Sequence, residues 1–302
     1  MNRSDNFSIS NSTNTIELLY ESAIRRNVFL IIASILCGIT CILTTLLIIV
    51  FIRQRSQGPK LLILHQLLTE AQLTMLHWPL YNLAFLLSQY GYYFPTVFCR
   101  YYLLLYMTNL TAGLWGLFIL ALNRLIAIGK PHFYERWNSP PVNIAMIAGC
   151  WLIGLCSYLY FFLGGEGGLA PVAPFGLCNF VQPGLRLVIA NIFGSYLPLL
   201  LTTVIYIPLL CKRRQRVAEA TTAVVGESQR KKQKLTRMLF GMAVVHVVCF
   251  SSVPVLNSFF PGFYSRDPMA RVWMRQVFCL GYLSTPISAE EPWDFFSGAI
   301  IR

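Results

Sequence analysis

Long apolar runs alternate with short polar segments along most of the chain. A transmembrane helix needs about 20 consecutive, mostly apolar residues, and seven runs reach or approach that length. These runs cover residues 27–52, 61–87, 97–128, 142–163, 185–211, 235–259 and 272–289. The seventh is short and contains Arg275 and Gln276, so its hydropathy alone does not require a span. The pattern predicts an all-α membrane protein, folded as a bundle of seven transmembrane helices.

The composition of the chain agrees with lipid as its main solvent. Hydrophobic residues make up 56% of the 302 residues and charged residues only 12%, whereas a soluble domain carries about 25% charged residues. The net charge of +12 would suggest nucleic acid as a partner of a soluble protein. Here the basic residues lie in short loops between apolar runs, where topology and anionic lipid headgroups explain them. We therefore expect membrane lipid, and no nucleic acid, as a partner.

The distribution of Lys and Arg favours one orientation of the bundle. With the N-terminus outside, the cytoplasmic segments are 53–60, 124–141, 212–237 and the C-terminal tail, and they hold 16 of the 24 Lys and Arg residues. Cytoplasmic loops of membrane proteins carry such an excess. The N-terminus is therefore expected outside and the C-terminus in the cytoplasm.

The N-terminal segment carries three N-glycosylation sequons within thirteen residues, which begin at Asn2, Asn6 and Asn11. One sequon arises easily by chance, but three in a short tail rich in Ser and Asn indicate an extracellular, glycan-bearing segment. The domain organisation predicted for this multi-pass plasma-membrane protein has three parts. They are an extracellular glycosylated tail at 1–26, a seven-transmembrane domain at 27–289 and a short cytoplasmic tail at 290–302.

Several residues in the predicted spans stand at distinctive spacings. Cys99 and Arg124 lie 25 residues apart, near the two ends of the third span. Trp151 lies in the fourth span, and Pro198 in the fifth is followed eight residues later by Tyr206. In order and spacing, these residues resemble those of the rhodopsin-like (class A) G-protein-coupled receptors, and the resemblance to this family, as a divergent member, covers almost the whole chain.

The resemblance implies a disulfide and a coupling site. Cys99 is expected to pair with Cys178, the only cysteine in the long outer loop between the fourth and fifth spans, where both would face an oxidising compartment; two unrelated free thiols are the alternative. Asn123 and Arg124 stand at the first two positions of the DRY motif of the family. Together with Tyr206, they imply a site for G-protein coupling at the cytoplasmic side.

Some positions depart from the family pattern. Glu70, in the second span, takes the place of the sodium-binding Asp of the family, and an ionisable residue at mid-membrane is a candidate functional residue. However, Thr44 and Gly113 replace other sodium partners of the family, so a protonated Glu70 hydrogen-bonded to a neighbouring helix stays open as the alternative interpretation. The seventh span reads TPISA at 285–289, where the family reads NPxxY.

The resemblance also indicates where a ligand would bind. The pocket residues it suggests are His77, Trp78, Tyr106, Phe250 and Tyr282. They are aromatic and nearly uncharged, which suits a small apolar ligand or a peptide, although its type stays open. Tyr106 stands where amine receptors carry an Asp, so a cationic amine would lack its counter-ion. The last predicted span contains no Lys, so retinal could not form its Schiff base.

These features favour a receptor that binds an extracellular ligand and activates a heterotrimeric G protein through a change of conformation. The chain contains no HExxH or GxSxG motif, no paired intramembrane Asp and no Cys spacing typical of metal ligands, so no enzymatic activity, cofactor or metal is expected. Two alternatives stay open. One is a small multi-span transporter or channel that uses Glu70 and proline-broken helices as its pathway. The other is a receptor-like protein that no longer signals.

Overall fold

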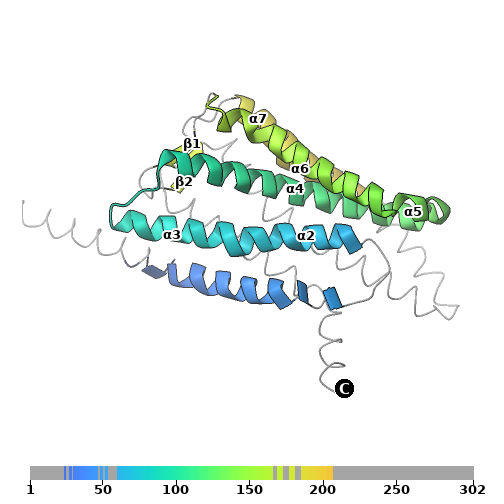
Figure 1. Cartoon of the computed structure of the whole chain (residues 1–302), viewed down its shortest axis with the longest axis horizontal. Helices are drawn as coiled ribbons and strands as arrows, with labels where there is room; N and C mark the ends of the chain where they lie inside the picture. Colours follow the sequence, from blue (N-terminus) through green and yellow to red (C-terminus); the bar gives the residue numbers. More distant parts are fainter. Residues whose placement is uncertain are drawn as a thin grey trace, which may run out of the picture.

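A computed structural model of the chain describes residues 24, 27–28, 30–46, 48–49, 52–53, 60–165, 169–172, 177–180 and 185–206. Within these residues the chain is almost entirely helical (Figure 1). The sixth and seventh predicted spans, at 235–259 and 272–289, lie outside the described residues, as do Asn2, Asn6 and Asn11.

The second, third and fourth predicted spans begin and end within two residues of the observed helices, whereas the predicted end of the fifth lies outside the described residues. The first helix covers Leu30–Leu46. The second run folds as one continuous rod made of α2 (Lys60–Gln72), the π-helical segment η1 (Leu73–His77) and α3 (Trp78–Gln89). The remaining helical elements are α4 (Thr96–Gly129), α5 (Pro131–Trp137), α6 (Pro140–Phe162), α7 (Leu185–Asn191) and the π-helical segment η2 (Ile192–Tyr196), which continues as helix to Tyr206.

The described helices have the length and surface of membrane spans. Three of them, at Thr96–Ala127, Pro140–Phe162 and Leu185–Tyr206, are long and apolar enough to cross a bilayer. Many of their exposed side chains are apolar, for example Leu152 and Leu200. In water this surface would be costly, whereas lipid tails solvate it. The prediction of a helical membrane protein is therefore confirmed.

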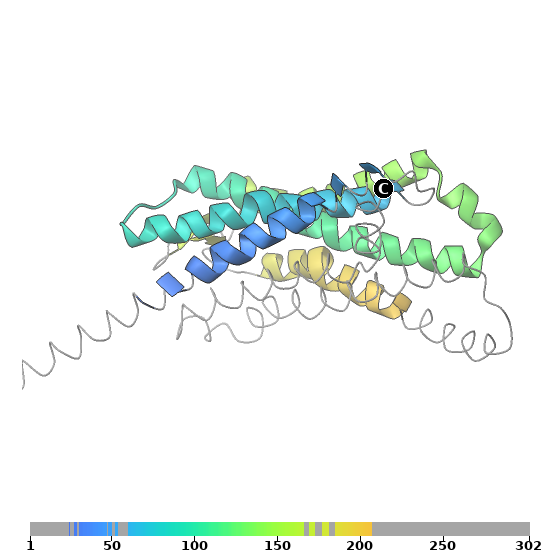
Figure 2. The same ribbon diagram turned by 90° about the horizontal axis from the view of Figure 1, so that it is seen from below.

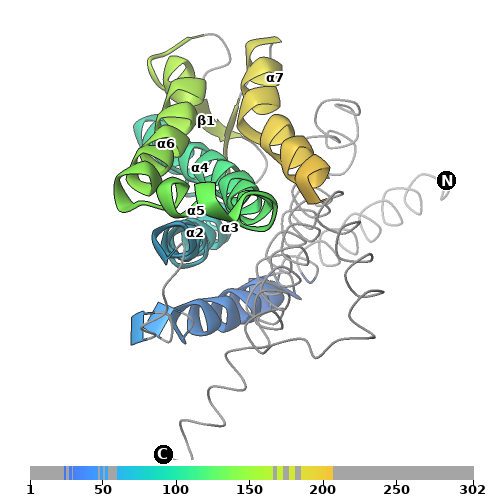
Figure 3. The same ribbon diagram turned by 90° about the vertical axis from the view of Figure 1, so that its right-hand side faces the viewer.

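Helix α4 lies at the centre of the described bundle. It packs along α6 on one side and along the α2–η1–α3 rod on the other (Figures 1 and 3). The first helix runs obliquely across the rod, on the side away from α4 (Figure 2). The contact between α4 and α6 is close because Gly154 has no side chain, and a Cβ there would lie 2.7 Å from the carbonyl oxygen of Thr108. Small residues at such crossings let helix backbones approach each other in membranes.

A disulfide and a short hairpin mark one end of the bundle. Strands β1 (Leu169–Val172) and β2 (Leu177–Phe180) pair antiparallel and contact α4. Cys99, in the first turn of α4, is bonded to Cys178 in β2. This end is called the disulfide end below, and the opposite end of α4 is called the Arg124 end. The hairpin and the short helix α5, which begins with a Pro at its first position, were not predicted from the sequence.

The π-helical segment η1 ends two residues before Pro79. In η1 the N–H of Trp78 donates to the carbonyl of Leu73, five residues back. The next carbonyl, that of Thr74, would need the N–H of residue 79 in the same pattern. Proline has no N–H, so the rod leaves the oxygen of Thr74 free for another donor.

Segment η2 repeats this arrangement in the fifth predicted span. It ends two residues before Pro198, and the N–H of Leu197 donates to the carbonyl of Ile192. The next carbonyl, that of Phe193, is the one that loses its partner to the proline. It accepts a hydrogen bond of 3.2 Å from the indole Nε1 of Trp115, on α4. A side chain of a neighbouring helix thus replaces the missing backbone donor.

Candidate ligand and coupling sites

The disulfide between Cys99 and Cys178 confirms the pairing implied by the resemblance. Both cysteines are buried, and their Cα atoms lie 5.1 Å apart. They belong to a hydrophobic cluster that also contains Tyr158 and Phe161 of α6. The bridge therefore ties the hairpin to the end of α4 and holds it where it contacts both α3 and α4.

Three of the five predicted pocket residues fall in the described part of the chain. His77, at the end of η1, and Trp78, at the start of α3, are both buried. The ring of His77 lies with its centroid 5.3 Å from that of Tyr106 on α4, in an edge-to-face contact. Trp78 instead makes its ring contact with Tyr81, at 6.0 Å. The structure therefore brings His77 and Tyr106 together, whereas Phe250 and Tyr282 lie outside the described residues.

Tyr102 is a site residue that the sequence analysis missed. Its hydroxyl donates to the carbonyl of His77 at 3.2 Å, and its ring stacks parallel to that of Tyr106. Its ring also lies 5.4 Å from the ring of His77. Residues four apart share one face of a helix, so the spacing from Tyr106 is the signal that points to Tyr102.

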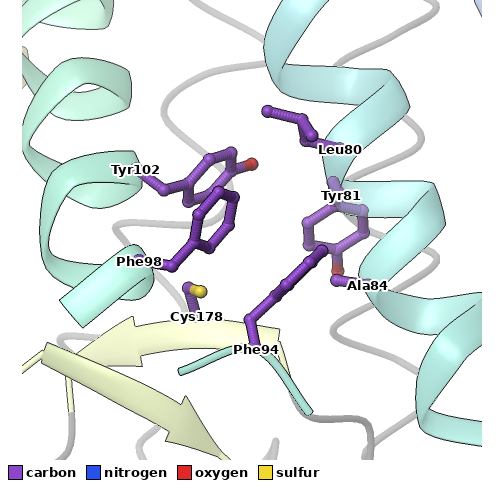
Figure 4. A pocket seen from close by; sticks show the side chains of 7 residues that line it. All are labelled: Leu80, Tyr81, Ala84, Phe94, Phe98, Tyr102 and Cys178. Carbon is purple, nitrogen blue, oxygen red and sulfur yellow. The ribbon is translucent and has the colours of Figure 1, made fainter. Parts of the chain in front are cut away.

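A small apolar cavity adjoins this aromatic group on the side of the disulfide. It is partly open, and its empty volume of about 190 Å³ includes open solvent. Figure 4 shows Phe98 and Tyr102 of α4 on one side of it, facing Tyr81 of α3 and Phe94, with the sulfur of Cys178 close by. Leu80 and Ala84 complete the lining. Tyr102 thus forms a wall of this cavity and also contacts His77.

Glu70 is buried in α2. The side-chain amide Nε2 of Gln66 donates to Oε1 of Glu70 at 3.2 Å. One residue earlier, the carbonyl of Thr69 accepts from Nδ2 of Asn109 on α4, at 3.0 Å. The carboxyl group therefore lies in a buried polar layer of amides and hydroxyls. Among the described residues, no group of three or more His, Cys, Asp or Glu side chains could hold a metal ion.

Thr44 and Gly113, which replace other residues of the family near this position, also face the interior. Thr44 is buried on the first helix. A Cβ at Gly113 would lie 3.4 Å from Oγ1 of Thr69, an ordinary contact distance. Gln66 is the partner of Glu70 that sequence reasoning missed, although its spacing of four residues on one helix could have indicated it.

Asn123 and Arg124 lie at the far end of α4, and both side chains are buried. The guanidinium group of Arg124 lies near Tyr206, which is itself buried, and near Tyr134 of α5. Within the described part of the chain, Nε and Nη2 of Arg124 and both polar side-chain atoms of Asn123 have no hydrogen-bond partner. The structure thus brings together the three residues of the predicted coupling site and adds Tyr134.

The family model described as 7 transmembrane receptor (rhodopsin family) matches residues 27–287. This range contains the first six predicted spans, all but the last two residues of the seventh and both sites described above, and the match confirms the resemblance stated from the sequence. No curated protein matches the chain.

Proposed function

Because the chain belongs to the rhodopsin family of seven-transmembrane receptors, we propose that it binds an extracellular ligand and activates a heterotrimeric G protein at the plasma membrane. The proposed bundle has seven spans, with the disulfide end outside and the Arg124 end in the cytoplasm. Segment 1–26 is then an extracellular tail glycosylated at Asn2, Asn6 and Asn11, and segment 290–302 is a cytoplasmic tail.

The observation that supports this function best is that α4 carries one half of each site. At the disulfide end, Tyr106 of α4 packs against His77. At the other end, Arg124 of the same helix is buried near Tyr206. Eighteen residues of helix separate Tyr106 from Arg124, or about 27 Å at 1.5 Å per residue. A single rigid element therefore connects the proposed ligand pocket to the proposed coupling site.

The proposed mechanism is a shift between two conformations. The ligand favours the state in which the cytoplasmic end of the sixth helix moves outward, as the family implies, and Arg124 becomes free to contact the G protein. Asn123 carries no charge, so Arg124 lacks the neighbouring carboxylate that the DRY motif supplies. Within the described residues, Nε and Nη2 of Arg124 have no hydrogen-bond partner, and an unpaired buried charged donor is costly. The resting state is therefore held weakly, and basal signalling should be raised.

The proposed ligand is a small apolar molecule or a peptide with aromatic or aliphatic groups. The described part of the pocket consists of His77, Trp78, Tyr102 and Tyr106, with no Asp or Glu among them. Glu70 is proposed to act as a buried polar anchor of α2, since Gln66 donates to it. In this role it holds the shape of the bundle and takes no direct part in ligand binding.

Nucleotide exchange on purified G proteins tests the proposal. The full chain in nanodiscs, screened with ligand pools, should accelerate exchange above empty discs. The substitution Arg124→Ala should abolish this acceleration. The matched change Arg100→Ala, of an exposed arginine at the disulfide end of the same helix, should leave it intact.

Other results would overturn parts of the proposal. Exchange that survives Arg124→Ala would refute the coupling site. If the chain failed to accelerate nucleotide exchange on every G protein tested, with every ligand pool, it would be a receptor-like protein that does not signal. Ion or solute flux through liposomes that carry the chain would favour the transporter instead.

A further inference from the structure

Pro79 leaves the carbonyl oxygen of Thr74 without a backbone donor. This oxygen instead accepts hydrogen bonds from two thiols of the first helix. Sγ of Cys37 lies 3.5 Å from this oxygen, and Sγ of Cys41 lies 3.4 Å from it. An unpaired carbonyl inside a bilayer is costly. The two cysteines therefore supply a donor that the rod needs, and they hold the first helix against η1.

The two sulfurs lie close to each other because they share one acceptor. Their separation cannot exceed the sum of the two distances, 6.9 Å. Cys37 and Cys41 are four residues apart, so they lie on one face of the helix with Cβ atoms about 5–6 Å apart. A disulfide needs Cβ atoms about 3.5–4.5 Å apart. The pair is thus spaced too widely for a direct S–S bond in a regular helix, but suitably for a single bridging atom.

The other free cysteines of the described chain do not form such a pair. Cys150 is buried and Cys156 is exposed, both on α6. Six residues separate them, so they point to different sides of the helix. Cys99 and Cys178 are already bonded to each other. Within the described residues, Cys37 and Cys41 are therefore the only pair of free thiols that point to the same acceptor.

We propose that Cys37 and Cys41 form an intramembrane dithiol site for a thiophilic centre that bonds both sulfurs at once, of which a trivalent organoarsenical is the fitting class. In the reaction with an arsine oxide, two As–S bonds form and the oxygen leaves as water with the two thiol protons. No atom changes its oxidation state. The product is neutral, which avoids the cost of a charge in the bilayer.

Occupation of this site should weaken the packing of the first helix. Bridging removes both S–H donors, so the oxygen of Thr74 loses both of its thiol partners. The segment concerned, η1, ends at His77, which contacts Tyr102 and Tyr106. The site itself depends on neither the ligand nor the G protein.

Phenylarsine oxide tests the proposal on the purified full chain in nanodiscs. Peptide mapping should find one phenylarsenic group that links Cys37 and Cys41, distinct from any adduct on Cys211, Cys249 or Cys279. Either Cys37→Ser or Cys41→Ser should remove this adduct. Both variants should still fold, because a serine hydroxyl also donates to the oxygen of Thr74. The matched variant Cys156→Ser should keep the adduct.

Thermal unfolding gives a second and independent readout. The reagent should lower the Tm of the wild-type chain and of Cys156→Ser, because both lose the thiol donors, and should not lower that of Cys37→Ser. The proposal is overturned if the folded wild-type chain forms no bridged adduct. It is equally overturned if the adduct persists in Cys37→Ser, or if the Tm of that variant falls as much as that of the wild type.

Discussion

The substitution Trp115→Phe tests how α4 supports the proline-broken fifth span. In the structure, Nε1 of Trp115 donates to the carbonyl of Phe193, the oxygen that loses its backbone partner to Pro198. Phenylalanine keeps an aromatic ring at this position and removes the donor. The carbonyl in η2 would then have no partner from α4.

The expected loss of stability follows from this single hydrogen bond. An intramolecular hydrogen bond contributes about 0.5–1.5 kcal/mol net, and side-chain hydrogen bonds between membrane helices average about 0.6 and reach about 1.7 kcal/mol. The acceptor lies five residues before Pro198, which has no N–H, and the N–H of Leu197 already donates to Ile192. The upper part of this range is therefore expected, about 1–1.5 kcal/mol.

Thermal unfolding of the purified chain in one detergent or nanodisc preparation measures this loss. The matched control is Trp78→Phe, because Nε1 of Trp78 is buried and has no hydrogen-bond partner in the described part of the chain. Both substitutions remove the same atoms, but among the described residues only Trp115→Phe breaks a hydrogen bond. Trp115→Phe should thus lower the Tm more than Trp78→Phe does. Equal losses, or a larger loss for Trp78→Phe, would refute the role assigned to Trp115.

Three further predictions concern packing, the disulfide and coupling. Gly154→Ala should destabilise the chain by about 1–3 kcal/mol in thermal unfolding, because its Cβ would lie 2.7 Å from the carbonyl oxygen of Thr108. The control Gly149→Ala should be nearly neutral, because a Cβ there meets nothing within 4 Å. Replacing Cys99 or Cys178 should cost about 2–5 kcal/mol and reduce surface expression, and non-reducing peptide mapping that found both thiols free would contradict the bridge. The double change Thr285→Asn with Ala289→Tyr should raise ligand-driven signalling severalfold, because a hydrogen bond from the new tyrosine to Tyr206, worth about 1 kcal/mol, would favour the active state. An unchanged rate of nucleotide exchange would contradict this interpretation of the seventh span.

The sequence was sufficient for features that depend on local pattern. Apolar runs of the right length place the helices, since a bilayer demands about 20 apolar residues regardless of their order. The spacing from Cys99 to Arg124, combined with family resemblance, leads to the disulfide partner Cys178. Tyr102 could have been found from Tyr106 by helical spacing alone.

Contacts between distant residues could not be predicted in this way. Pro79 and Pro198 show in the sequence that two carbonyls lose a donor, but the sequence does not say which side chain replaces it. Trp115 lies 78 residues from its acceptor in η2, and Cys41 lies 33 residues from Thr74. Such pairs depend on how the helices pack, which a local pattern does not encode.

The orientation of the bundle is the premise of both proposed sites, and an epitope tag after Arg302 measures it directly. With seven spans, the C-terminus lies on the same side as the Arg124 end of α4. Cells that express the tagged full chain should bind antibody only after permeabilisation, while a tag before Met1 should stain intact cells. Staining of the C-terminal tag on intact cells would place that end outside and contradict the seven-span receptor.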